Sequence, residues 1–93
     1  MKKQYAVYND PGHGWMAVKR QELEELGILN QISSYSYQRG QTVYLEEDCD
    51  ASLFIQTKKA RGEELQIKDQ HTDHNSPIRS YESFTPNILG EHS

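Results

Sequence analysis

Stretches in which bulky residues alternate with small or polar ones predict a β-hairpin at the start of the chain. Residues 5–8 (Tyr-Ala-Val-Tyr) and residues 14–18 (Gly-Trp-Met-Ala-Val) both read as short strands. Between them, residues 9–12 (Asn-Asp-Pro-Gly) are the types that turns favour, because Asp caps its own backbone, Pro presets φ and Gly accepts positive φ.

Further strands are expected in the middle and the C-terminal third of the chain. Residues 34–37 (Ser-Tyr-Ser-Tyr) follow the strictest period of two in the sequence. After a turn at residues 39–40, residues 42–45 (Thr-Val-Tyr-Leu) form the next predicted strand, and residues 64–68 form another. Residues 69–77 are polar and typical of a loop, and residues 78–81 (Ile-Arg-Ser-Tyr) are expected to form a short edge strand.

Two helices separate these strands. The first covers residues 19–26 and ends at Gly27, with Leu23 and Ile28 at the positions that touch in a Schellman ending. The second follows Asp48 or Asp50, either of which could cap it. Its apolar stripe is followed by basic residues and by Gly62, which is typical of a helix end.

The order ββαββαβ predicts an α+β fold in a single small domain. We expect a mainly antiparallel sheet with the two helices packed on one face, over residues 1–84. Residues 85–93 contain little apolar material and are expected to form a flexible or weakly docked tail.

Composition narrows the class of protein further. The chain has 93 residues, of which only 34% are hydrophobic, and its mean hydropathy is −0.91, so we expect a thin core in which aromatic side chains count heavily. No apolar run is long enough to cross a bilayer, and residues 1–5 lack the apolar stretch of a secretory signal. The single cysteine, Cys49, excludes an internal disulfide and favours a reducing, cytoplasmic location.

Charge argues against a typical nucleic-acid binder. The net charge is −4, and the acidic residues concentrate between positions 21 and 56. A nucleic-acid binder usually carries a basic stripe that neutralises phosphates, and this sequence has none. The acidic middle indicates either a solvated surface or a face for a basic partner.

His13 is the first candidate binding residue. It lies between two glycines and just before Trp15, the only tryptophan. The glycines would let the backbone approach a ligand closely, and imidazole titrates near neutral pH. The alternative is a tight glycine turn in which Trp15 is the largest core residue.

Tyrosines beside arginines are the second group of candidates. Tyr35 and Tyr37 are followed by Arg39, and Arg79 by Tyr81. If exposed, such residues often dominate the energy of protein contacts, and they can also stack on single-stranded bases. The alternative is that these rings replace scarce aliphatic residues in the core.

Metal and nucleophile sites have weaker support. His71 and His74 are three residues apart, but the residues between them disfavour a helix. The acidic residues of positions 46–50 lack the glycine and the distal glutamate of a calcium loop. Cys49 has carboxylates on both sides, which raise a thiol pKa. We therefore expect no metal, no cofactor and no catalytic residue.

Most of residues 5–84 resembles the small, uncharacterised proteins carried by tailed phages and other mobile elements. The segments that carry this resemblance are residues 10–15, 34–37, 44–50 and 78–81. It implies a phage or prophage origin, and it assigns no activity.

Part of the chain also resembles the AbrB-like transition regulators, in which a strand enters a short helix that ends in Leu-Gly-Ile. The matching segments are residues 15–18, 26–28, 39–41 and 43–45. This resemblance implies a small DNA-binding regulator, although residues 29–38 are longer than that family's linker and its arginine-rich surface is missing.

These observations favour a non-enzymatic protein that binds a host or phage protein. Nucleic acid is a less favoured partner, a membrane is not expected, and a homodimer stays open. The residues expected to bind the partner are His13, Trp15, Tyr35, Tyr37, Arg39, Arg79 and Tyr81.

Overall fold

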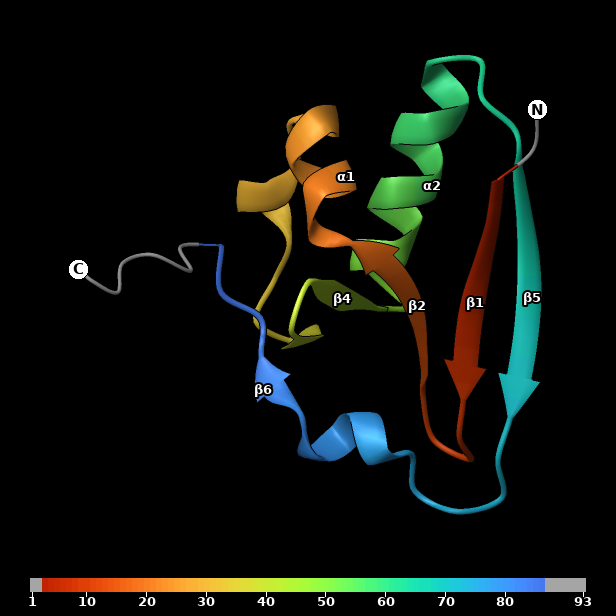
Figure 1. Ribbon diagram of the computed structural model, residues 1–93. Helices are drawn as coiled ribbons and strands as arrows, with labels where there is room; N and C mark the ends of the chain where they lie inside the picture. Colours follow the sequence, from red (N-terminus) through yellow and green to blue (C-terminus); the bar gives the residue numbers. More distant parts are fainter. Residues whose placement is uncertain (1–2, 87–93) are drawn as a thin grey trace.

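Six strands form one mixed sheet in the order β5-β1-β2-β4-β3-β6, accompanied by two α-helices (Figure 1). This computed structural model describes residues 3–86. Along the chain the elements are β1 (Lys3–Asn9), β2 (Gly14–Lys19), α1 (Arg20–Leu26), the 3-10 helix η1 (Leu29–Gln31), β3 (Tyr37–Arg39), β4 (Thr42–Glu46), α2 (Asp50–Ala60), β5 (Leu65–His71), the 3-10 helix η2 (Pro77–Ser80) and β6 (Glu82–Ser83).

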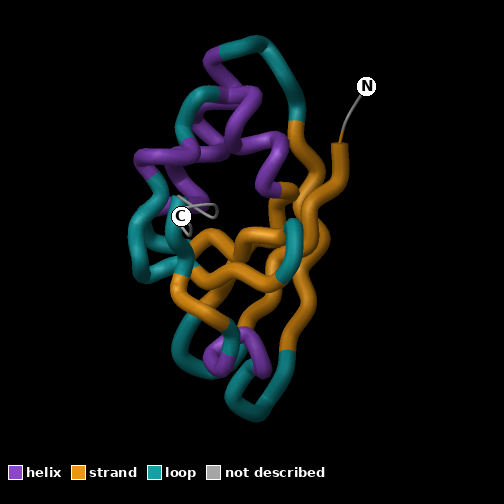
Figure 2. Tube along the Cα trace, turned by 60° about the vertical axis from the view of Figure 1, so that its left-hand side comes forward, coloured by secondary structure: helices purple, strands orange, loops and turns teal. Residues whose placement is uncertain are grey.

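The α+β class is confirmed. β1 and β2 form the expected antiparallel hairpin, and β2 pairs antiparallel with β4. The one parallel pair joins β1 to β5, so the two longest strands lie side by side although most of the chain separates them. α1 and α2 gather at one end of the molecule and η2 lies at the opposite end (Figures 1 and 2).

The end of α1 forms as the sequence predicts. Gly27 has a φ of 75°, which a residue without Cβ adopts at no steric cost. The Ile28 N–H donates to the Leu23 carbonyl over 3.1 Å, and the Gly27 N–H donates to the Glu24 carbonyl over 3.0 Å. These two bonds are the Schellman pattern.

The predicted strand over residues 34–37 is wrong. Residues 34–35 form a turn, and β3 starts only at Tyr37. The Ser33 and Ser36 hydroxyls donate to the Asp50 carboxylate over 2.7 and 2.5 Å, and the Ser36 N–H donates to the Ser33 carbonyl. These bonds hold the segment in a turn against Asp50. Its backbone is therefore not extended and cannot pair with a neighbouring strand.

The cap predicted for the second helix is also wrong. Cys49 occupies the N-cap position of α2 and makes no side-chain capping bond. Asp50 is the first helical residue. It is buried against residues 33–36, which we call the serine turn. The Glu46 carboxylate instead accepts the backbone N–H groups of Asp48 and Cys49.

Two boundaries in the C-terminal third differ from the sequence prediction. β5 continues through residues 69–71, which pair with β1, where a loop was expected. Residues 77–80 form η2 instead of an edge strand, because Pro77 fixes φ at the start of a helical turn and Ser76 accepts the Ile78 N–H. The edge strand is β6, over Glu82–Ser83, and it pairs with β3.

The hydrophobic core joins one face of the sheet to both α-helices. Met16 pairs with Val7 and Leu45, and Val18 pairs with Val43, so these side chains share one face. The core cluster contains residues of the strands, of both α-helices and of the connections between them, each at most 6% exposed: Tyr5, Met16, Val18, Leu23, Ile28, Ile32, Val43, Leu45, Ala51, Phe54 and Phe84. No helix within residues 3–86 is long and apolar enough to span a membrane.

A buried arginine holds the C-terminal segment on the domain. The Arg20 guanidinium donates to the carbonyls of Thr85 and Pro86 over 2.8 and 2.6 Å, and it lies 5.3 Å from the centre of the Phe84 ring. The first two residues of the expected tail are therefore attached to the domain. Residues 87–93, the remainder of that expected tail, lie outside the described residues.

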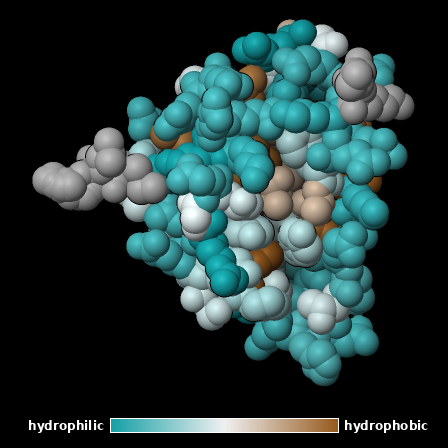
Figure 3. Space-filling model, in the orientation of Figure 1, coloured by the Kyte–Doolittle hydropathy of each residue, from teal (hydrophilic) through white to brown (hydrophobic). Residues whose placement is uncertain are grey.

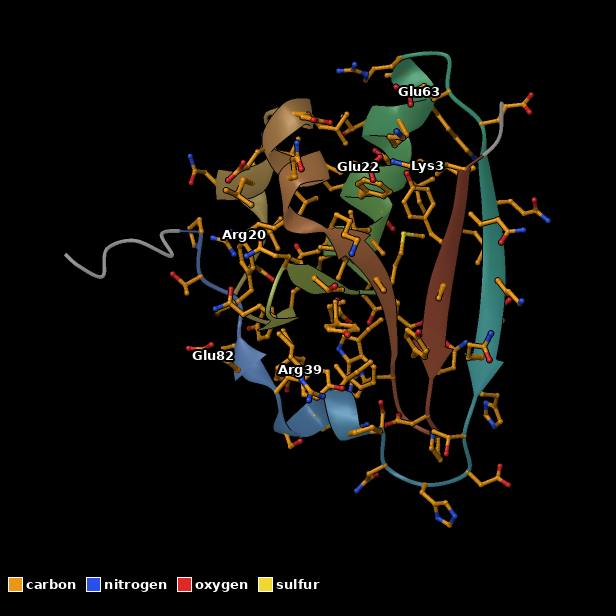
Figure 4. All side chains as sticks on the ribbon, viewed as in Figure 1. Lys3, Arg20, Glu22, Arg39, Glu63 and Glu82 are labelled. Carbon is orange, nitrogen blue, oxygen red and sulfur yellow. The ribbon has the colours of Figure 1, made fainter. Side chains whose placement is uncertain are left out.

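A buried ion pair links α1 to α2. Lys58 donates to Glu22 over 2.8 Å and to Glu63 over 2.6 Å, and the Tyr5 hydroxyl donates to Glu22 over 2.6 Å. Lys3 is a further partner of Glu22, and Figure 4 shows Lys3, Glu22 and Glu63 near the upper ends of α2 and β1. Burial by itself lowers the pKa of Lys58, but the hydrogen bonds to the two carboxylates outweigh it and raise that pKa.

We expect Lys58→Met to destabilise the protein by about 3 kcal/mol, because it leaves Glu22 buried without its main counter-charge. The matched control is Lys59→Met at the exposed neighbouring lysine, which should change stability by less than about 0.5 kcal/mol. Urea unfolding at pH 7 measures both values. Equal effects of the two substitutions would show that the ion pair has no special role.

Candidate functional site

The face of the sheet opposite the core is lined by aromatic side chains. Trp15 pairs with Tyr8, and Tyr44 pairs with Tyr37 and Ala17, which places these rings on the second face. Trp15 and Tyr37 make an edge contact with ring centres 6.1 Å apart, and Tyr8 and Tyr44 lie 6.3 Å apart. Figure 3 shows pale atoms of intermediate hydropathy at the centre of its view, bordered by hydrophilic atoms.

The segment around η2 covers part of this aromatic face. The Arg79 guanidinium lies 5.5 Å from the centre of the Trp15 ring. Tyr81 contacts Tyr44 at 5.2 Å between ring centres, and Arg39 donates to the Tyr81 hydroxyl over 3.1 Å. Trp15 is only 2% exposed as a result, although it lies outside the main core cluster.

Asp10 fastens this covering segment to the hairpin. Its buried carboxylate accepts two hydrogen bonds from Arg79, of 2.6 and 3.0 Å, and one from the Ser76 N–H. It also accepts the N–H groups of Gly12 and His13 in its own turn. The Arg79 hydrogen bonds, followed by the bond from the Ser76 N–H, hold the pKa of Asp10 far below its usual range.

A hollow of about 360 Å³ opens beside Trp15. Its lining combines aromatic, basic and acidic groups from the hairpin, the serine turn, the β4–α2 connection and η2: His13, Trp15, Tyr35, Tyr37, Glu46, Asp48, Cys49 and Arg79. These segments are far apart in the sequence, and the sheet register and the Asp10 ion pair bring them together.

The hollow contains most of the residues that the sequence singled out. His13, Trp15, Tyr35, Tyr37 and Arg79 all line it. Arg39 and Tyr81 do not line it and instead bind each other farther along the second face.

Sequence reasoning missed the acidic side of this site. From the sequence, Glu46 and Asp48 could be a helix cap, a metal cluster or part of an acidic face for a basic partner, and Cys49 a nucleophile, but no local signal places them beside the tyrosines, with which they line one hollow. Asp10 was also read only as a turn residue. Its position in an Asp-Pro-Gly turn was a signal for local capping, but the chain gives no local signal for Arg79, which lies 69 positions later.

The tyrosines divide between core and surface. Tyr5 is 5% exposed and contacts Phe54 in the core, whereas Tyr35 is 74% exposed at the tip of the serine turn. Tyr37, Tyr44 and Tyr81 are half-buried on the second face. Of the candidate tyrosines, Tyr35 is exposed, Tyr37 and Tyr81 are half-buried, and none of the three belongs to the core cluster.

Trp15 has an unused hydrogen-bond donor. Its buried Nε1–H has no partner within residues 3–86. An indole N–H that is removed from water without an acceptor carries an energetic cost, so such groups are rare in folded proteins. A ligand or a water molecule with an acceptor atom would remove that cost.

The arrangement does not resemble a metal centre or a nucleophilic site. The described part of the chain has no group of three His, Cys, Asp or Glu side chains placed to hold a metal. His71 meets only the exposed Asp73, at 3.4 Å. Cys49 and His13 line the same hollow, yet no hydrogen bond joins them, whereas an activated thiol needs a base within hydrogen-bonding reach.

Fold and site together define a small α+β protein with a mixed sheet, one face in the core and one aromatic face that carries a charged hollow. Comparison with protein-family models, with curated proteins and with solved structures found no match to this chain.

We expect Asp10→Asn to lower the melting temperature at pH 7 by more than about 5 °C, because it removes the charge that Arg79 and three backbone N–H groups bind. The pKa of Asp10 is lowered by folding, so its contribution is complete above about pH 4 and is lost as the pH falls further. The difference between the two proteins should therefore shrink in acid. Melting curves between pH 2 and pH 7 measure it, with the exposed Asp73→Asn as control. A difference that is constant over this range would contradict the assignment.

Proposed function

We propose that this chain is a non-enzymatic protein-binding module whose hollow receives an arginine or lysine side chain of a partner protein. The observation that carries the proposal is the composition of the hollow, in which aromatic rings and carboxylates lie around one opening. The sequence resemblance to small phage proteins supports a bacterial host protein as the partner, met in the cytoplasm.

Rings and carboxylates together favour an organic cation. The faces of Trp and Tyr attract ammonium and guanidinium groups, each contact being worth about 0.5–1 kcal/mol at an exposed site. Tyr35 presents such a ring at the rim, and Trp15 and Tyr37 line the hollow with it. Glu46 and Asp48 supply the opposite charge on the acidic side of the same opening.

Arg79 already shows this chemistry within the chain. Its guanidinium lies against Trp15 and is neutralised by Asp10, so its charge does not compete for Glu46 or Asp48. The hollow thus has carboxylates beyond those that its own arginine uses. The negative charge of these carboxylates favours a cation over an anion as the ligand of the hollow.

The Trp15 Nε1–H favours a peptide over a free amine. A simple cation has no acceptor for this donor, whereas a polypeptide brings backbone carbonyl groups with every basic side chain. The same carboxylates disfavour nucleic acid, because Glu46 and Asp48 would face phosphates. A DNA-binding regulator, which the AbrB-like segments imply, is the competing function.

Trp15 provides the measurement, because it is the only tryptophan and it lines the hollow. We expect its fluorescence to change on titration with an acetylated, amidated Gly-Ser-Arg-Ser-Gly peptide, with a Kd of about 0.1–1 mM. The same peptide with citrulline in place of arginine, which keeps the shape and loses the charge, should bind at least about 5-fold more weakly.

Two substitutions test the location. Tyr35→Ala and Asp48→Asn should each weaken binding about 2- to 5-fold, while the matched changes Tyr8→Ala and Asp73→Asn, outside the hollow, should not. Equal binding of the arginine and citrulline peptides would reject a cation site. Binding of single-stranded or duplex DNA at low salt, without any binding of the arginine peptide, would replace the proposal with the nucleic-acid function.

A further inference from the structure

The two edges of the sheet differ in length. At one end of the sheet, β6 has two residues, whereas at the other end β5 has seven, Leu65–His71. In Figure 1, β5 forms the right-hand border of the sheet, and β1 is its only neighbour among the described strands. Every residue of β5 after Leu65 is exposed, and Ile67 is one of the few large hydrophobic residues at the surface, at 40% exposure.

Alternate residues of β5 present their backbone groups outward. The Thr72 N–H donates to the Asn9 carbonyl over 2.9 Å, so the even-numbered residues before it turn their N–H and C=O groups toward β1. The odd-numbered residues Leu65, Ile67 and Asp69 therefore direct theirs away from the sheet. β5 is regular, because each of its residues pairs in sequence with one of β1, without a bulge or a proline.

We infer that β5 pairs antiparallel with β5 of a second copy of this chain, centred on Ile67, and joins the two sheets into one. A long, straight edge is a template for adding a strand, and natural monomers blunt such edges with bulges, prolines, charged side chains or short strands. β6 is blunted by its length, and β5 has neither a bulge nor a proline. The charged residues of β5, Lys68 and Asp69, stand opposite uncharged residues in the proposed register.

Charge and the length of the paired segment together select the register. Centring on Gln66 or on Gln70 would pair only three residues of β5. A twofold axis perpendicular to the sheet leaves each side chain on its own face, so the axis must lie midway between the two copies of one β5 residue. Centring on Lys68 or on Asp69 places like charges directly opposite each other, which is unfavourable. Centring on Ile67 places two exposed isoleucines together, with Lys68 opposite the partner subunit's Gln66 and Leu65 opposite the partner subunit's Asp69.

This register also matches the backbone. The opposed pairs that must exchange hydrogen bonds are the odd-numbered residues, and these are the residues whose N–H and C=O groups point outward. The paired segment is residues 65–69 of each copy. A second copy therefore matches this edge in hydrogen bonding and in the Ile67 contact, and no like charges stand directly opposite each other.

Molecular mass in solution gives the first test. Light scattering after size exclusion at 100 µM should report twice the chain mass of 10.8 kDa. Ile67→Lys places two ammonium groups on the axis and should give a monomer, whereas Gln21→Lys makes a lysine at an exposed helix position and should leave the dimer intact. A monomeric wild-type protein, or a dimer that survives Ile67→Lys with a folded circular-dichroism spectrum, would overturn the inference.

Cross-linking tests the register. Three variants in a Cys49→Ser background each carry one cysteine, at position 67, 68 or 69. Each variant is then exposed to mild oxidation. The proposed register places the two Cα atoms of residue 67 about 5.5 Å apart, within disulfide reach, and those of residue 69 about 14 Å apart. Dominant cross-linking of I67C supports the register, and dominant cross-linking of K68C or D69C rejects it.

The two proposals are separable. β5 contributes no residue to the hollow. The Ile67→Lys monomer should therefore bind the arginine peptide as the wild type does. A protein that dimerises without binding the peptide would retain this inference and lose the proposed function, and the reverse result would retain the function alone.

Discussion

The second face of this protein depends on one buried carboxylate. Asp10 closes the β1–β2 turn through the N–H groups of Gly12 and His13, and it binds Arg79 and the Ser76 N–H from the other end of the chain. Without that charge, η2 would lose its attachment to the hairpin and Arg79 its position against Trp15. Because Trp15 and Arg79 both line the hollow, the candidate site exists only while this ion pair does.

A thin core explains why both faces of the sheet are used. The helix side holds the aliphatic residues, whereas the other side is closed by Trp15, by the tyrosines and by Ile78 of η2, which is 3% exposed. Tyrosine suits a half-buried face, since its ring packs while its hydroxyl stays in water. A chain of mean hydropathy −0.91 can therefore cover part of both faces of a sheet, and it leaves Tyr8, Tyr35 and Ile67 exposed.

The features that the sequence predicts correctly are those that depend on residues close together in the chain. Gly27 and the spacing of Leu23 and Ile28 placed the end of α1 correctly, because a Schellman ending involves only residues near that end. The strand predicted for residues 34–37 is wrong because Ser36 binds Asp50, and no pattern within the segment indicates that partner. The start of η2 is local as well, because Ser76 is the N-cap and Pro77 opens the helical turn, both of which are typical of a helix start. The hollow needed the sheet register and the Asp10–Arg79 pair, both of which are long-range.

In the proposed function, Trp15 would link binding of the partner to stability. It is as buried as a core residue, yet it lines the hollow and retains an unpartnered Nε1–H. A partner that supplies an acceptor and a cation would improve the packing of Trp15 and strengthen the closure of η2 over the sheet. Binding to the folded state then raises stability as ligand concentration exceeds Kd. If the proposed partner binds there, it would add to the stability of a site that Arg79 and Asp10 already hold in place.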